Sequence, residues 1–152
     1  MNKLQALLDL FAEYAGPSER TELLLSYADK FKEVPAAVAT RPFDQSALVP
    51  HCESEAYVWV VPNADGTLKL HFAVENPSGI SAKALAAILD RTLSGLPAEE
   101  IAKVDPEIVE KIFRQNISMG KGMGLMSMVQ RVQQLAKRAA QSPVSSPGGE
   151  RT

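Results

Sequence analysis

Residues 55–74 read EAYVWVVPNADGTLKLHFAV, and this stretch decides the fold class. Valine and aromatic residues from Tyr57 to Val61 favour a strand, and the segment from Asn63 to Gly66 has the composition of a tight turn. Apolar and polar residues then alternate from Leu68 to Val74, as in a strand with one buried face. The pattern predicts an antiparallel hairpin. A lone hairpin is marginal in water, so either a third strand or an edge contact, together with helices across one face, must complete it.

Before and after this hairpin in the sequence, apolar residues recur at the spacing of an α-helix. Helices are predicted at residues 4–11, 19–32 and 81–93, in two short segments that start at Pro97 and Asp105, and after the glycine-rich segment 117–125. Strands and helices do not alternate, which excludes a parallel α/β sheet. The sequence therefore predicts an α+β fold in which helices cover one face of a small antiparallel sheet.

Length and composition indicate one compact domain at residues 1–141, followed by a disordered tail at residues 142–152 that is rich in serine, proline and glycine. The net charge of −2 gives no general electrostatic reason to bind nucleic acid or an anionic membrane. No stretch approaches the roughly 20 apolar residues of a membrane span. We expect a cytoplasmic protein in a reducing compartment, which suits a free thiol.

Cys52 is the only cysteine of the chain. A single thiol cannot form an internal disulfide, complete a four-cysteine metal site or anchor an iron–sulfur cluster unaided. It follows Pro50 and His51 in a polar turn that ends an irregular segment, residues 34–53, and precedes the first strand. Long loops in compact domains are often functional. Cys52 is therefore either an inert packing residue or a reactive sulfur.

Two other residues are candidates for assisting such a sulfur. His51 is a candidate for promoting the thiolate, although it is equally compatible with a solvated loop residue. Lys121, within the segment from Gly120 to Gly124, is a candidate for stabilising an anion at the start of the last helix, and the alternative is a flexible start of that helix.

Other chemistries find less support in the residues. A cysteine hydrolase needs a base, and besides His51 the chain offers only His71, in a strand. Neighbouring His51 and Cys52 match no common zinc spacing, and the glycine-rich segment lacks the Ser or Thr that follows lysine in a P-loop. Four methionines near this segment either fill the core or form a patch for a partner: Met119, Met123, Met126 and Met128.

Several segments, in order, resemble the SufE family of sulfur-acceptor proteins. These are VPHCESEAYVWV at residues 49–60, SAKAL at 81–85, GLPAEEI at 95–101 and GKGMGL at 120–125. The resemblance runs from about Leu7 to Ala140. Three positions depart from the family pattern: His51 stands where glycine is usual, Lys121 replaces an arginine, and residues 77–79 replace an acidic step. Because glycine enters positive φ freely and histidine does not, the loop backbone is expected to be affected at His51.

The resemblance implies a function for the lone thiol. Cys52 would accept persulfide sulfur from a group II, SufS-type cysteine desulfurase, stimulate that enzyme, and pass the sulfur to a SufBCD-type scaffold for iron–sulfur cluster assembly. The protein would not be an enzyme in its own right and would need no cofactor or metal, because the pyridoxal phosphate belongs to the desulfurase. A weak homodimer is a further association that the sequence allows.

Two alternatives stay open at this point. One is a non-catalytic interaction module with a structural cysteine, and the other is a scaffold for cluster assembly. A scaffold generally needs several cysteine ligands, and this chain has one.

Overall fold

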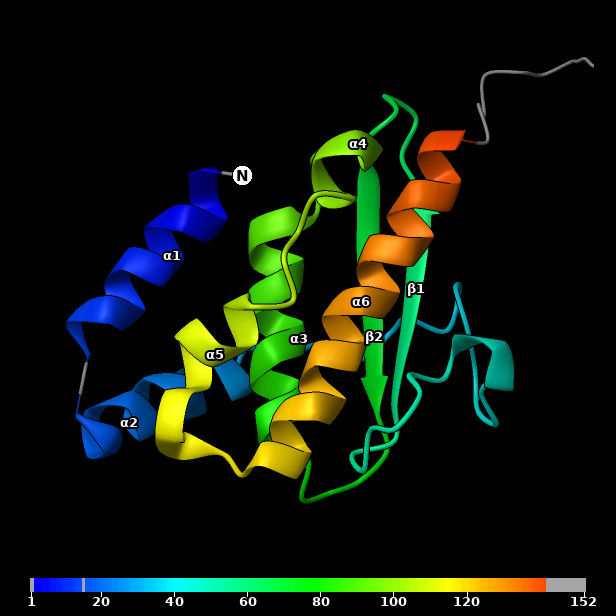
Figure 1. The fold of residues 1–152 in the computed structure, drawn as a ribbon. Coiled ribbons are helices and arrows are strands. Elements are labelled where there is room, and N and C mark those ends of the chain that lie inside the picture. Colours follow the sequence, from blue (N-terminus) through cyan, green and yellow to red (C-terminus); the bar gives the residue numbers. More distant parts are fainter. Residues whose placement is uncertain (1, 15, 142–152) are drawn as a thin grey trace, which may run out of the picture.

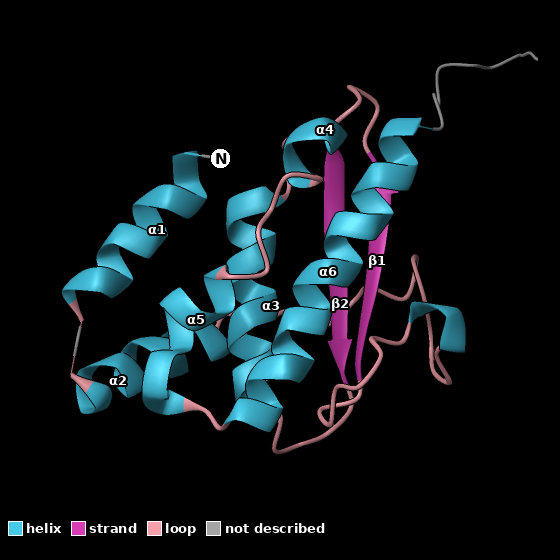
Figure 2. Ribbon diagram, in the orientation of Figure 1, coloured by secondary structure: helices cyan, strands magenta, loops and turns pink. Residues whose placement is uncertain are grey.

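The computed structural model describes residues 2–14 and 16–141, so the predicted tail at residues 142–152 lies outside the described part. A two-stranded antiparallel sheet forms one layer, and helices pack on one of its faces (Figures 1 and 2). In chain order the elements are α1 (Asn2–Glu13), α2 (Pro17–Ala28), β1 (Ala56–Pro62), β2 (Leu68–Val74), α3 (Ile80–Leu93), α4 (Ala98–Ile101), α5 (Ile108–Phe113) and α6 (Met119–Gln141), with 3₁₀ turns at Gln45–Ala47 (η1) and Arg114–Asn116 (η2). This arrangement confirms the predicted α+β fold.

The hairpin pairs Ala56 with Val74 at one end and Pro62 with Leu68 at the other. No third strand joins it within the described residues. Isolated bridges extend its edges instead, where Glu33 pairs with Phe72, Leu48 with Tyr57, and Thr67 with Pro97. Of the two alternatives for completing the sheet, the structure therefore has the edge contact.

The main core lies between the sheet and the helices. Because successive side chains of a strand point to opposite faces, Val58 and its partner Phe72 lie on the same face, and both are almost fully buried. Helices α3 and α6 cover this face, and α1 and α2 pack behind α3 (Figure 1). Arg20 is also fully buried, and its guanidinium donates hydrogen bonds to carbonyl oxygens at the ends of α1 and α5, namely those of Phe11 and Ile112. One side chain thus joins the carboxyl ends of two helices.

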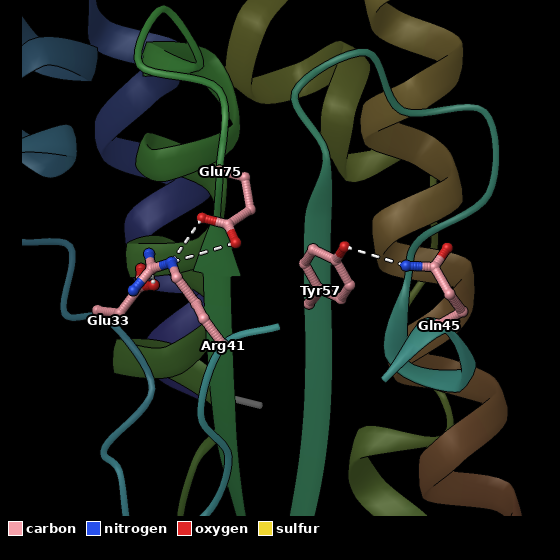
Figure 3. Close-up of polar contacts among 5 residues, drawn as sticks. All are labelled: Glu33, Arg41, Gln45, Tyr57 and Glu75. Atoms are coloured by element: carbon pink, nitrogen blue, oxygen red, sulfur yellow. Dashed lines mark hydrogen bonds and ion pairs between the residues drawn. The ribbon is translucent and has the colours of Figure 1, made fainter. Parts of the chain in front are cut away.

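The opposite face of the sheet is covered by the irregular segment 34–49. Phe43 contacts Tyr57 and Trp59 with ring centroids 5.1 and 5.2 Å apart, and Val34 and Ala47 complete a small cluster. Figure 3 shows how polar side chains hold this segment to the sheet: Arg41 donates hydrogen bonds to both Glu33 and Glu75, and Gln45 donates to the Tyr57 hydroxyl. The segment is an ordered cover for the sheet rather than a bare connection.

Three of the differences from the predicted helix boundaries have a clear local cause. Helix α2 ends at Ala28 rather than near Lys32, because the chain tightens into turns there while Phe31 still packs on the core. Helix α5 begins at Ile108 rather than at Pro106, and Asp105 instead accepts a hydrogen bond from the Glu107 N–H. The glycine-rich segment does not lead into the last helix, because α6 already begins at Met119.

Candidate functional site

Cys52 lies in a tight loop between η1 and β1. The Val49 N–H donates to the Ala56 carbonyl at 2.8 Å, and the Glu55 N–H donates to the Cys52 carbonyl at 3.1 Å, so the loop closes on itself around the thiol. Two residues that bracket the cysteine have positive φ, His51 at 59° and Glu55 at 54°. Cys52 itself is half-buried against the edge of the main core.

The Cys52 side chain faces a small pocket, which we call the Cys52 pocket. It is built from the loop itself and from the first turns of two helices that come from distant parts of the chain, and these meet at one end of the molecule (Figure 1). The start of α3 contributes Gly79 and Ser81, and the start of α6 contributes Gly120, Lys121 and Gly124. The cavity volume is about 20 Å³, room for about one water-sized group beside the sulfur.

Two glycines let the helices approach the loop this closely. A β-carbon on Gly124 would lie 3.0 Å from the His51 carbonyl oxygen and 3.2 Å from the Cys52 α-carbon. A β-carbon on Gly79 would lie 2.8 Å from the Val74 side chain and 3.1 Å from the Ser54 β-carbon. Both glycines are buried. The width of the Cys52 pocket is therefore set by the absence of side chains at these two positions.

Two helix starts and one cation at the pocket favour a negative charge, although the exposed carboxylate of Glu53 also lines it. The amino-terminal N–H groups of an α-helix have no partner within the helix and carry the positive end of its dipole, so two such ends at one pocket attract an anion. Ser118 fixes the start of α6, because its hydroxyl accepts a hydrogen bond from the Lys121 N–H at 3.2 Å. The exposed side chain of Lys121 adds a full positive charge at the rim. The two helix amino termini and Lys121 therefore favour an anion at the pocket, and Glu53 opposes one.

The structure brings together Cys52 and Lys121, two of the three predicted site residues. The third, His51, is exposed and does not line the pocket, so its imidazole has no visible role at the sulfur. Its backbone matters instead, because its φ of 59° lies in the region that glycine enters freely. The histidine thus adopts the type of backbone conformation expected of the glycine that it replaces.

The loop that carries Cys52 is fastened at its amino-terminal side. Asp44 caps η1 by accepting a hydrogen bond from the Ser46 N–H at 2.8 Å, and this bond lowers the pKa of the Asp44 carboxyl. From α6, Arg131 donates to the Ser46 carbonyl oxygen at 2.8 Å. Helix α6 therefore contacts the loop twice, through Arg131 at η1 and through Gly124 at Cys52. Arg131 did not stand out in the sequence, and the segments that contain Gly79 and Gly124 were noted there without the close approach that these two glycines allow.

His71 lies away from this site. It lines a different hollow of about 300 Å³ beside β2, together with Lys69 and Asp90. Burial lowers the pKa of His71, and the charge of Lys69 adds to this effect while Asp90 opposes it. Since His71 does not line the Cys52 pocket, it is not placed to act as the base of a cysteine hydrolase. Among the residues described, no group of three or more His, Cys, Asp and Glu side chains is placed to hold a metal ion.

Comparison with known proteins identifies the family of this chain. Residues 5–136 match the SufE family, described as an Fe-S metabolism associated domain. The chain belongs to the SufE family. It is thus a SufE-like protein of iron–sulfur metabolism, and the matched range spans the positions of Cys52, both glycines and Lys121.

Three relatives show how far this SufE-like chain resembles known proteins. It is 28% identical over 135 residues to "SufE-like protein 1, chloroplastic/mitochondrial" of Arabidopsis thaliana, and 39% identical over 95 residues to an uncharacterized SufE-like protein of Rhizobium etli. These matches cover 88% and 59% of the chain, but 34% and 62% of the two relatives. A solution structure of a hypothetical protein from Thermus thermophilus matches with a TM-score of 0.71 and 25% identity, covering 92% of this chain and 97% of that one.

The structure also bears on association with a membrane. No helix in residues 2–14 or 16–141 combines the length and the apolar character that a membrane crossing requires.

Proposed function

We propose that this SufE-like protein is a sulfur acceptor that carries a persulfide on Cys52. Its sulfur donor would be a group II, SufS-type cysteine desulfurase, which it would also stimulate, and its acceptor would be a SufBCD-type scaffold for cluster assembly. The observation that supports this most directly is the position of the lone thiol, which is half-buried in a small pocket between two helix amino termini and Lys121.

The transfer is an exchange between thiolate and persulfide. The Cys52 thiolate attacks the outer sulfur of the donor's persulfide, a new S–S bond forms on Cys52, and the donor's own S–S bond breaks. The donor cysteine leaves as a thiolate, and the outer sulfur keeps its proton as it moves to Cys52. No external oxidant or reductant is needed. The Cys52 persulfide then loses the same sulfur to the next thiolate by the same exchange.

The geometry suits both the sheltering of a persulfide and its delivery to a partner. The pocket has room for about one added group beside the sulfur, which would shelter a persulfide from other thiols. The two helix amino termini and Lys121 would stabilise its negative charge. Delivery to a partner requires the sulfur to leave the pocket, so we propose that residues 45–54 move when the partner docks. The hydrogen bonds from Arg131 to the Ser46 carbonyl and from Gln45 to the Tyr57 hydroxyl hold this loop and would open.

The alternative of a structural cysteine makes a different prediction for the thiol. A packing cysteine would resist alkylation in the native protein, whereas a half-buried thiol at a pocket should react with iodoacetamide. The rate of native alkylation, compared with the rate in denaturant, separates the two roles.

The proposal is tested with Cys52→Ser, which replaces the sulfur atom by oxygen and changes the side-chain volume little. With ³⁵S-cysteine and a group II desulfurase, the wild-type protein should acquire label and raise desulfurase turnover, and the variant should do neither. Ser54→Ala is the matched control, since it changes the same pocket but keeps the thiol. A Cys52→Ser protein that still acquires label and stimulates turnover would defeat the proposal.

A further inference from the structure

A second hollow lies on the other flank of the first turns of α6. Its floor is apolar and consists of Ile117, Met119, Met123 and Met126, which we call the methionine groove. The cavity volume is about 250 Å³. Met119 is 85% exposed and Met123 is 65% exposed, whereas Met128, the other methionine of this helix, is fully buried in the core. The methionines that the sequence grouped together thus divide between core and surface.

Exposed apolar side chains gather at the end of the molecule that holds Cys52. Five large hydrophobic residues are exposed within the described part of the chain, and three of them, Ile80, Met119 and Met123, lie in the first turns of α3 and α6. These are the two helix starts that build the Cys52 pocket. Single exposed hydrophobic residues are ordinary, but a group of them around a reactive residue marks an interaction surface, and methionine adapts well to a partner.

The charges around the groove are of both signs, since Glu110 lines the groove and Glu53 lines the neighbouring Cys52 pocket. Arg114 and Glu110 line its rim, and Lys121 lies on the opposite flank of α6, beside the Cys52 pocket. Among the described residues, neither the Arg114 guanidinium nor the Lys121 ammonium makes a hydrogen bond or ion pair. Arg114 also lies close to buried Arg20, whose pKa is lowered by burial and further by the charge of Arg114. Arg114 and Lys121 are therefore available to pair with carboxylates of a partner.

Geometry links the groove to sulfur transfer. A donor must bring its persulfide into contact with Cys52, so its surface has to cover the mouth of the pocket. A helix with its side chains is about 10–12 Å across, so the two flanks of α6 lie about that far apart. A standard protein interface buries about 800 Å² on each partner, which corresponds to a radius of about 16 Å. A donor docked over Cys52 would therefore also cover the methionine groove.

We propose that the methionine groove and Arg114 form the docking surface for the sulfur-donating desulfurase. The complementary surface on that partner is an apolar side chain flanked by carboxylates: the apolar group fills the groove, and the carboxylates pair with Arg114 and Lys121. This inference rests on the proposed function, since it concerns the donor of the same sulfur.

The test measures the Kd between the full-length protein and a group II desulfurase without cysteine, and the concentration that half-saturates sulfur transfer. Met119→Asp and Arg114→Glu should each raise both quantities about tenfold or more, because they place like charges opposite the partner's carboxylates. The matched controls Met119→Leu and Arg114→Lys keep apolar character and charge, and should stay within about twofold of wild type. Native alkylation of Cys52 should be unchanged in all four variants, which shows that the pocket is intact.

Each outcome of this experiment supports or overturns the docking proposal. If the wild-type protein accepts sulfur and both charged variants bind the desulfurase with the wild-type Kd, the docking proposal is overturned and the proposed function stands. If the wild-type protein accepts no sulfur, both proposals fall. A wild-type homodimer that Met119→Asp dissociates, with no change in desulfurase binding, would identify a second copy as the occupant and also overturn the proposal.

Discussion

The two faces of the hairpin are covered by different kinds of structure. One face packs against α3 and α6 and belongs to the main core, which includes Phe72. The other face packs against the irregular segment 34–49 through a small cluster centred on Phe43. The main core buries most of the apolar side chains, whereas the small cluster holds the segment that leads to Cys52. The difference indicates that one face provides most of the stability of the fold and the other holds the segment that leads to the site.

The largest loss of stability is expected for a substitution on the face of the hairpin that the helices cover. Phe72→Ala should lower the free energy of unfolding by about 3–5 kcal/mol, because it removes a ring that is 2% exposed in the main core. Urea denaturation followed by circular dichroism measures this change. A loss below about 1 kcal/mol would show that the helix-side core does not dominate stability.

Replacing a phenylalanine on the face that segment 34–49 covers should cost less stability. Phe43→Ala should lower the free energy of unfolding by only about 2 kcal/mol, because a small cluster at the surface can collapse around the missing ring. It should release residues 34–53, which hydrogen exchange would detect as faster exchange confined to that segment. Phe43→Leu is the control that keeps most of the apolar volume. If Phe43→Ala destabilises the whole protein as much as Phe72→Ala, the two faces form a single unit and the comparison fails.

A smaller effect on stability, with a clear effect on function, is expected at Gly124. Gly124→Ala gains about 1 kcal/mol of helix propensity, and this gain offsets the strain of a β-carbon 3.0 Å from the His51 carbonyl oxygen. The loop must shift, so sulfur transfer to Cys52 should slow by about tenfold, since small displacements of reacting groups are costly. Gly120→Ala is the matched control, because a β-carbon there meets nothing within 4 Å. Equal transfer rates in the two variants would show that the close approach of α6 is unimportant.

The smallest change in stability and in sulfur transfer is expected for a substitution of His51. His51→Gly should stabilise the protein by up to about 1 kcal/mol, because glycine adopts a φ of 59° without strain. Sulfur transfer should stay close to the wild-type rate, since the imidazole is exposed and does not line the pocket. The measurements are a thermal melt and a transfer assay. A large loss of transfer would instead assign the imidazole a part in forming the thiolate, the role for which the sequence made it a candidate.

Local signals in the sequence predicted much of this molecule. The hairpin follows from the alternation at residues 68–74 and the turn before it, and Cys52 stood out because it has no second cysteine to pair with. The end of α2 was predicted too late because Phe31 continues the apolar period after the helix has ended. The start of α6 was also predicted too late, since glycines disfavour helix and the Ser118 cap was overlooked.

The parts that could not be predicted depend on contacts between distant segments. Gly79 and Gly124 matter because each lies against the Cys52 loop, and no sequence period records that approach. The bond from Arg131 to the Ser46 carbonyl joins residues 85 positions apart. The Phe43 cluster likewise has no period, because an irregular segment folds over the sheet through individual side chains.

Intact mass spectrometry tests the central claim most directly. The wild-type protein is incubated with a group II desulfurase and cysteine, and its mass is compared before and after treatment with a reductant. We predict a reductant-sensitive gain of one sulfur atom, located by peptide mapping on the peptide that contains Cys52. An unchanged mass while the desulfurase turns over in the same tube would contradict the account.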